Sequence, residues 1–267
     1  MTDGVSSILP DFDEKLVTAP VRFAGHSFMV LSTGALYWPE RRTLILGDLH
    51  FGKAERVARR GGALLPPFGD LDTLARLDAT LFFTKPACVI SLGDAFDDDE
   101  AGRSLARSVK ARLAAIAKVT DWIWITGNHD PGKHDLPGDI MPELRFGNLA
   151  FRHQAGGPSG RGPDISAHFH PKTRIAGRTA RALLVGEEHM ILPAFGTFTG
   201  GLEMDHPELA RLTGGGIAYA MGRKILRVPI PALPEAVAVS EAEPDTEATT
   251  EDVADAPMAA PESKAQP

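Results

Sequence analysis

The chain has 267 residues and a formal net charge of −7, from 28 lysines and arginines against 35 aspartates and glutamates. This length supports a sizeable core, and 43% hydrophobic with 24% charged residues is typical of a soluble globular protein. The single cysteine, Cys88, excludes a disulfide framework and an all-cysteine zinc site. Because no apolar stretch approaches the roughly 18 residues of a membrane span and residues 1–14 are acidic rather than a secretory signal, we expect a cytoplasmic protein.

Apolar runs alternate with helical patterns along the body of the chain. Strands are predicted over 21–31, 43–46, 87–92 and 121–126. A helix is predicted over 71–83, where leucines recur at spacings of three and four, and another over about 100–118, with Asp97 among its capping acids. Loops rich in glycine and proline follow at 131–148 and 155–163, and a second set of strands at 149–152, 164–168, 182–185, 189–192 and 224–228. Two strand sets with helices outside predict a layered α/β sandwich.

The end of the chain differs in composition from the rest. Residues 235–267 hold nine acids and one base, so the remainder of the chain has a net charge of only +1. This segment is rich in Ala, Pro, Glu, Asp and Thr and contains no aromatic residue. We therefore predict a folded domain over 1–230 and a disordered acidic tail over 231–267. The tail is either a solubilising extension or an acidic segment that competes with nucleic acid for a basic surface.

Polar turns follow the predicted strands. Three of them begin with glycine, and two histidine segments end later apolar runs: Gly47-Asp48-Leu49-His50, Gly93-Asp94, Gly127-Asn128-His129-Asp130, His153 and His168-Phe169-His170. In open α/β sheets, ligands bind at the carboxyl ends of strands. We therefore expect these five pieces to converge on one place.

The side chains in these turns suit two divalent cations. Carboxylate oxygens and imidazole nitrogens bind borderline metals such as Mn, Fe, Zn or Co. In Asp48-x-His50 and His168-x-His170 the paired side chains point to the same side of an extended segment, and Asp94 is able to bridge two ions about 3.5–4 Å apart. Each piece alone has a common structural explanation, as a turn, a helix cap or an isolated histidine. Four histidines outside the pattern are expected to be structural: His26, His134, His189 and His206.

These motifs together resemble those of the calcineurin-like metallophosphoesterases, over about residues 43–172. Ala167 stands where that family usually has glycine, which removes no ligand. Segments 47–54, 168–171 and 192–201 give a narrower resemblance, over about 21–228, to bacterial ligase-associated DNA damage response endonucleases. The resemblance implies a four-layer double β-sandwich flanked by helices.

The same resemblance implies roles for individual residues. One metal would be held by Asp48, His50 and His170, and the other by Asn128, His153 and His168, with Asp94 bridging. His129 would contact the scissile phosphate and protonate the leaving oxygen. The implied activity is that of a manganese-dependent DNA endonuclease or phosphodiesterase in repair. Functional association with a DNA ligase, a helicase and an exonuclease is implied as well.

Substrate contacts are harder to predict from the residues. Basic side chains follow the first metal turn, of which Lys53 and Arg56 are the expected substrate-binding pair, and Arg103, Arg107 and Lys110 share a helical face. A solvated surface explains the first group as well as substrate binding does and explains the second group better. No aromatic residues interleave with either group to form a stacking platform. Two other functions stay open: a small-molecule phosphoesterase or nucleotide pyrophosphatase, and a non-catalytic scaffold. The complete ligand set argues against the scaffold.

Overall fold

The computed structural model describes residues 16–62, 65–66, 68–98, 100–101, 105–129, 134–156 and 162–232. All of them belong to the unit Met1–Pro234. The tail predicted for 231–267 lies almost entirely outside the described residues, as do Arg103 and Asp130. The boundary at 230 therefore stays a prediction.

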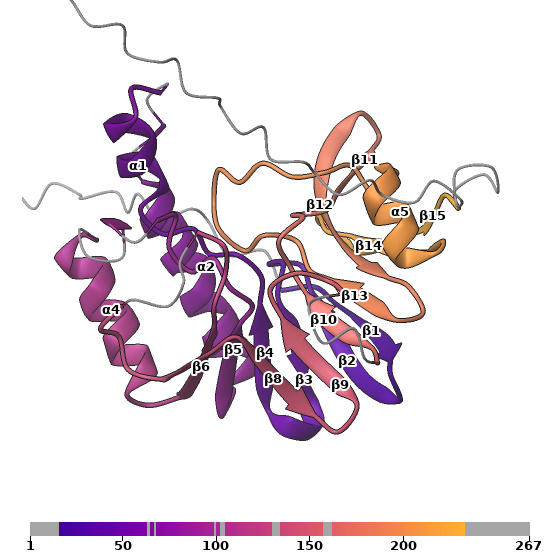
Figure 1. Cartoon of the computed structure of the whole chain (residues 1–267), viewed down its shortest axis with the longest axis horizontal. Coiled ribbons are helices and arrows are strands. Elements are labelled where there is room, and N and C mark those ends of the chain that lie inside the picture. The colour runs from indigo at the N-terminus through magenta and orange to yellow at the C-terminus, as the bar shows by residue number, and fades with distance from the viewer. Residues whose placement is uncertain are drawn as a thin grey trace, which may run out of the picture. The chain divides into compact units, whose positions relative to one another are not determined.

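The first sheet contains seven strands that pair in chain order (Figure 1). They are β1 (Thr18–Phe23), β2 (His26–Leu31), β3 (Leu36–Trp38), β4 (Thr43–Leu46), β5 (Cys88–Ser91), β6 (Asp121–Ile125) and β7 (Asp139–Met141). The β1–β4 pairings are antiparallel, whereas β4 to β7 run parallel. The parallel strands are apolar on both faces: Leu44 and Leu46 pack into one core and Ile45 into the other.

The second sheet holds the later strands. They are β8 (Glu143–Phe146), β9 (Leu149–Arg152), β10 (Asp164–Ser166), β12 (Arg178–Val185), β13 (His189–Ile191), β14 (Gly216–Ala220) and β15 (Leu226–Ile230), with β11 (Lys172–Ile175) paired to β12. Their order is β15-β14-β12-β13-β10-β9-β8. Strand β10 pairs in parallel with β9 on one side and β13 on the other.

Helices cover the outer faces of the two sheets, giving four layers. The described helices are α1 (Lys53–Arg59), α2 (Gly69–Thr84), α4 (Arg107–Ala117), α5 (Pro207–Thr213) and the 3-10 turn η1 (Pro39–Arg41). Helices α2 and α4 pack on the first sheet through Leu77 and Leu113, α5 packs on the second through Leu209, and a third core fills the space between the sheets. The predicted helix-flanked α/β sandwich is therefore confirmed. Within the described ranges, no helix is long and apolar enough to cross a membrane.

Several predicted boundaries are wrong. The strand expected at 21–31 is the β1–β2 hairpin, whose turn residues Ala24 and Gly25 have positive φ (49° and 80°), as two-residue hairpin turns require. The loop expected at 131–148 contains β7 and β8. The helix expected over about 100–118 is interrupted at residues 105 and 106: residues 100 and 101 are helical, and α4 forms the later part. Leu71, counted in the apolar stripe of α2, is 57% exposed.

Candidate metal centre

Ligand-type side chains from both sheets meet at one end of the fold. Asp48 and Asp94 follow β4 and β5, whereas His153 follows β9 in the other sheet. Asp48 is fully buried, and Asp94 and His153 are 2% and 8% exposed. The parallel strands deliver their carboxyl ends to this shared edge, as the sequence predicts.

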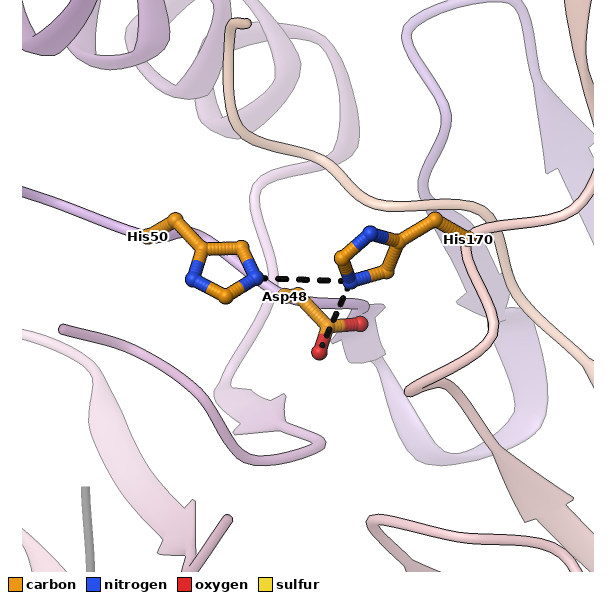
Figure 2. Close-up of side chains that lie close together, drawn as sticks. All are labelled: Asp48, His50 and His170. Atoms are coloured by element: carbon orange, nitrogen blue, oxygen red, sulfur yellow. Dashed lines mark hydrogen bonds and ion pairs between the residues drawn. The ribbon is translucent and has the colours of Figure 1, made fainter. Parts of the chain in front are cut away.

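The first group consists of Asp48, His50 and His170, whose ligand atoms all lie within 4.8 Å of one another (Figure 2). His170 Nε2 lies 3.3 Å from His50 Nε2 and 3.2 Å from Asp48 Oδ1. Burial raises the pKa of the Asp48 carboxyl. Contact with His170 and the charges of the surrounding histidines outweigh this effect and hold the pKa well below its usual range. The carboxylate is therefore ionised, as a metal ligand must be.

The second group consists of Asp94, His153 and His168, again within 4.8 Å. Asn128 joins it, because its Oδ1 lies 2.8 Å from His153 Nε2 and 3.1 Å from His168 Nδ1. His153 Nδ1 donates to the Leu92 carbonyl at 2.8 Å, which leaves Nε2 as the lone-pair atom facing the site. Burial, followed by the neighbouring His153, lowers the pKa of His168. A neutral imidazole is the form that binds metal.

The two groups fit divalent cations. Asp48 Oδ1 is buried and accepts no hydrogen bond beyond its charge contacts with His170 and His153, and imidazole nitrogens face one another at 3.3 Å in the first group and 3.0 Å in the second. Nitrogen lone pairs that face one another at such distances repel each other. A cation bound between them removes this repulsion. All the donors are nitrogen or oxygen, as borderline divalent metals prefer. Asp94 belongs to the second group, and its bridging of both ions stays a prediction.

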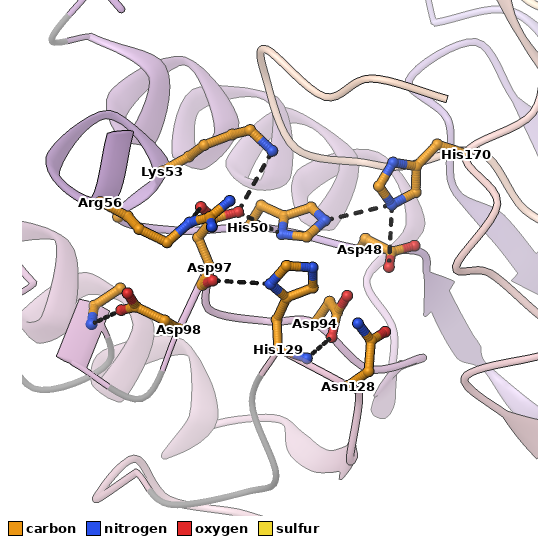
Figure 3. A network of polar contacts seen from close by, with 12 residues as sticks. Asp48, His50, Lys53, Arg56, Asp94, Asp97, Asp98, Asn128, His129 and His170 are labelled. Atoms are coloured by element: carbon orange, nitrogen blue, oxygen red, sulfur yellow. Dashed lines mark hydrogen bonds and ion pairs between the residues drawn. The ribbon is translucent and has the colours of Figure 1, made fainter. Parts of the chain in front are cut away.

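Asp97 has a role that the sequence analysis missed. Its fully buried carboxylate lies 2.9 Å from His50 Nδ1 and 3.4 Å from Lys53 Nζ, and it also binds Arg56 Nε (Figure 3). Burial raises the pKa of this carboxyl, but His50, Arg56 and Lys53 hold it well below its usual range. Within the acidic run predicted to cap the next helix, the capping contact is made by Asp98, whose Oδ1 accepts from the Ala101 N–H at 2.6 Å. Asp97 is not that cap, and its carboxylate contacts His50 instead. The available signal was its place three residues after Asp94 in the same turn.

His129 lies beside both metal groups without belonging to either. Its backbone N–H donates to Asp94 Oδ1 at 2.9 Å, and its Nδ1 lies 3.1 Å from the Asp97 carbonyl oxygen. A carbonyl only accepts, so Nδ1 carries a proton and Nε2 is left for other contacts. The ring is half-buried and packs edge-on to His50 (Figure 3).

Two glycines allow the turns to pack tightly. An added Cβ at Gly127 would lie 2.0 Å from Asp94 Oδ1, and one at Gly93 would lie 2.5 Å from the His153 ring. Gly93 also has φ of +93°, a conformation that side chains rarely adopt. Glycine therefore opens these turns because the ligands of the neighbouring turns occupy the space.

Four of the metal-group residues have left-handed backbones. The φ values are 46° for His50, 45° for Asp94, 66° for His168 and 47° for His170. For residues other than glycine this conformation is unfavourable by roughly 1–2 kcal/mol. Hydrogen bonds between turns help to maintain it: the His50 N–H donates to the Asp94 carbonyl at 2.9 Å.

The predicted substrate-binding pair, Lys53 and Arg56, is brought to the site but engaged with Asp97, and the two side chains are 21% and 18% exposed. Arg59 pairs with Asp98 at 2.8 Å. On α4, Lys110 pairs with Asp135 at 2.7 Å. Lys53, Arg56, Arg59 and Lys110 are therefore each paired with an acidic residue of this chain.

The remaining histidines lie outside both groups, as expected. His26 packs against Trp38, and His134 against Trp124. His189 Nδ1 lies 3.0 Å from Asp164 Oδ1, whereas His206 accepts from the Glu208 N–H at the start of α5. Each has a structural contact that accounts for it.

Comparisons with known proteins identify the family of this chain. A solved structure of the Pseudomonas putida nuclease MPE is 29% identical, with a TM-score of 0.63, over 79% of this chain and 100% of that chain. The Escherichia coli phosphoesterase YfcE is 15% identical, with a TM-score of 0.36, over 71% of this chain and 99% of that one. No curated protein sequence matches. The family model for calcineurin-like phosphoesterases matches residues 41–177, which include every residue of both metal groups. The chain therefore belongs to the calcineurin-like phosphoesterases, hydrolases of phosphoester bonds that use a dinuclear divalent metal site.

Proposed function

We propose that this protein is a two-metal phosphodiesterase that cleaves the DNA backbone, with manganese as its working metal. The observation that carries the proposal is the convergence of two complete sets of nitrogen and oxygen donors beside His129. The likeness to a nuclease over the whole of that nuclease's chain supports a nucleic-acid substrate. The donor chemistry is compatible with manganese.

The two groups support a role for each metal-binding residue. We assign Asp48, His50 and His170 to one ion, and Asn128, His153 and His168 to the other, with Asp94 between them. When bound, the two ions supply charge neutralisation of the phosphate and a hydroxide nucleophile at neutral pH. The protein holds the donors in place before binding through the contacts of His50 with Asp97 and of His153 with the Leu92 carbonyl.

His129 is proposed as the general acid. With Nδ1 protonated against the Asp97 carbonyl, the imidazolium form carries its transferable proton on Nε2. Transfer of that proton to the departing sugar oxygen leaves a neutral ring whose remaining proton is already on Nδ1. The ring therefore donates without having to change its orientation.

Lys53 and Arg56 contribute through Asp97 in the structure. Their cations neutralise the Asp97 carboxylate, which in turn contacts His50. We propose that they act first as positioning residues of the metal centre. Direct contact of these two residues with substrate, expected from the sequence, stays a prediction. In the cell we propose a cytoplasmic role in DNA repair, in functional association with a ligase, a helicase and an exonuclease.

One assay tests the proposed function. Purified protein is incubated with Mn²⁺, Mg²⁺, Co²⁺ or Zn²⁺ on supercoiled plasmid, in parallel with a panel of nucleotides and nucleotide pyrophosphates. Nicking of plasmid with Mn²⁺, abolished by Asp94→Ala together with a loss of bound metal, is the expected result. Turnover of nucleotides with intact plasmid would instead identify a small-molecule phosphoesterase, and inactivity of metal-loaded protein on every substrate would identify a scaffold.

A further inference from the structure

A loop that follows β13 packs against both the first metal turn and the His170 turn. The Gly196 N–H donates to the Asp48 carbonyl at 2.8 Å. At the other end of the loop, a Cβ added to Gly201 would lie 2.0 Å from the His170 carbonyl oxygen. The loop therefore touches the backbone of two ligands of the first metal group.

Helix α2 fixes this loop from the other side. Thr197 donates its backbone N–H to Thr73 Oγ1 at 3.1 Å and its hydroxyl to the Asp72 carboxylate at 2.5 Å. Arg76 binds the same Asp72 at 2.6 Å and also the Phe195 carbonyl. These contacts fix the middle of the loop against α2. The loop forms one wall of a cavity.

A cavity of about 240 Å³ lies between this wall and strands β11 and β12. It is lined by basic, hydroxyl and small residues and one aromatic ring: His170, Lys172, Thr179, Arg181, Pro193, Ala194, Phe198, Thr199 and Gly200. His170 belongs to the first metal group as well, so the cavity adjoins the metal centre.

The cavity wall carries positive charge, and the described residues that line it include no acidic side chain. Within the described ranges, neither Lys172 nor Arg181 forms an ion pair, and the acid nearest to Arg181 in charge effect is Asp72. Arg181 donates to the Gly196 carbonyl at 2.8 Å, whereas the nearby Asp72 is taken by Arg76. Burial, with the charge of Arg76 added, lowers the pKa of Arg181 to about 9, and the charge of Asp72 opposes this shift only in part. An unbalanced, partly buried cation favours the binding of an anion.

We propose that this cavity binds a phosphate of the substrate next to the phosphate that is cleaved. The proposal rests on the proposed function, because only a substrate with successive phosphates places one at the metals and another beyond His170. Lys172 and Arg181 supply charge, and the hydroxyls of Thr179 and Thr199 are donors on the same wall. The small volume suits a phosphate with its ester links rather than a whole nucleotide.

The test couples a change in the protein to a change in the substrate. The substrates are short oligodeoxynucleotides with one cleavable linkage, in which the neighbouring linkage is either a charged phosphodiester or a neutral methylphosphonate, placed on one side or the other. We expect Lys172→Ala to lower kcat/KM on the charged substrate about ten- to hundredfold. The methylphosphonate on one side should reduce that loss to a small factor. Arg181→Gln serves as a second variant and Lys224→Ala, which removes an exposed cation outside the cavity, as the matched control.

Binding of the same oligonucleotides, measured by fluorescence anisotropy, separates this proposal from the proposed function. If the wild type fails to cleave DNA but still prefers the charged ligand, and Lys172→Ala removes the preference, the nuclease assignment fails and the anion site stands. If Lys172→Ala weakens binding of the charged and the neutral ligand by the same factor, the anion site is refuted. It is also refuted if Lys172→Ala changes the binding of neither ligand. Mass spectrometry should show that each variant binds as much metal as the wild type. A change in binding or in kcat/KM is then an effect of the cavity and not of a lost metal ion.

Discussion

Replacing Asp97 by asparagine is the change that most directly tests how the metal centre is held. Asparagine keeps the size of the side chain but removes the charge that faces His50 at 2.9 Å, Lys53 at 3.4 Å and Arg56. Removing one partner of a buried ion pair costs about 3–5 kcal/mol of unfolding free energy. Because the Lys53 and Arg56 side chains are 21% and 18% exposed, water recovers part of this, and we expect about 2–4 kcal/mol.

The same change should weaken the metal site. A carboxylate that orients a metal-binding histidine typically contributes a factor of about 10–100 in metal affinity. Urea unfolding measures the first effect, and titration calorimetry with Mn²⁺ the second. Asp98→Asn is the matched control, because Asp98 is the next residue and pairs with Arg59 at 2.8 Å on the surface; it should lose about 1 kcal/mol and no metal affinity. Equal behaviour of the two variants in both measurements would refute the role given to Asp97.

Four further outcomes are expected. His129→Ala should keep its bound metal and lose about 10²–10⁴-fold in kcat on DNA but far less on a nitrophenyl ester, whose leaving group needs no proton; equal losses on both substrates would contradict a general acid. Burial raises the pKa of Asp70 to about 6 in the folded protein. Protonation of Asp70 therefore stabilises the folded state, and this stabilisation is complete below about pH 4 and is lost as the pH rises through 6. Asp70→Asn should therefore raise the unfolding free energy at pH 7.5 by about 1–2 kcal/mol, after allowance for partial exposure, and a pH series of urea melts checks it. Chelation with EDTA should lower the Tm of metal-loaded protein, since ions at 1,000 times Kd contribute about 4 kcal/mol to stability; an unchanged Tm would show that the groups do not bind metal tightly. Deleting 235–267 should leave the Tm unchanged and strengthen DNA binding at low salt, if the segment is the acidic tail that its composition predicts; a lower Tm would contradict that.

The metal centre was predictable because its signals are local in the sequence. A buried parallel strand such as β4 is a short apolar run, and the turn that follows it carries its ligands within four residues. The same locality explains the failures. The β1–β2 hairpin was missed because Ala24 and Gly25 give little sign of a turn inside a long apolar stretch. Short elements such as β3 are stabilised by pairing partners rather than by their own sequence.

Contacts between distant turns were beyond the reach of the sequence. Asp97 heads an acidic run, which locally indicates a helix cap, and its contact with His50 exists only because two parallel strands end side by side. The segment 192–201 was noted for its resemblance alone, and its packing against the Asp48 and His170 turns depends on the second sheet. Pairings across the two sheets require the tertiary structure.

The left-handed backbones of His50, Asp94, His168 and His170 limit how this site can be transferred to another protein. A designer who copies only the seven ligand-type side chains onto a new scaffold would place them on ordinary right-handed or extended residues, from which the donor atoms point elsewhere. The graft must carry whole turns, including Gly93 and Gly127 and the carbonyl groups that hold neighbouring turns together. The smallest transferable unit is therefore the set of strand ends from both sheets, and an engineered copy should be judged first on its backbone angles and only then on its ligands.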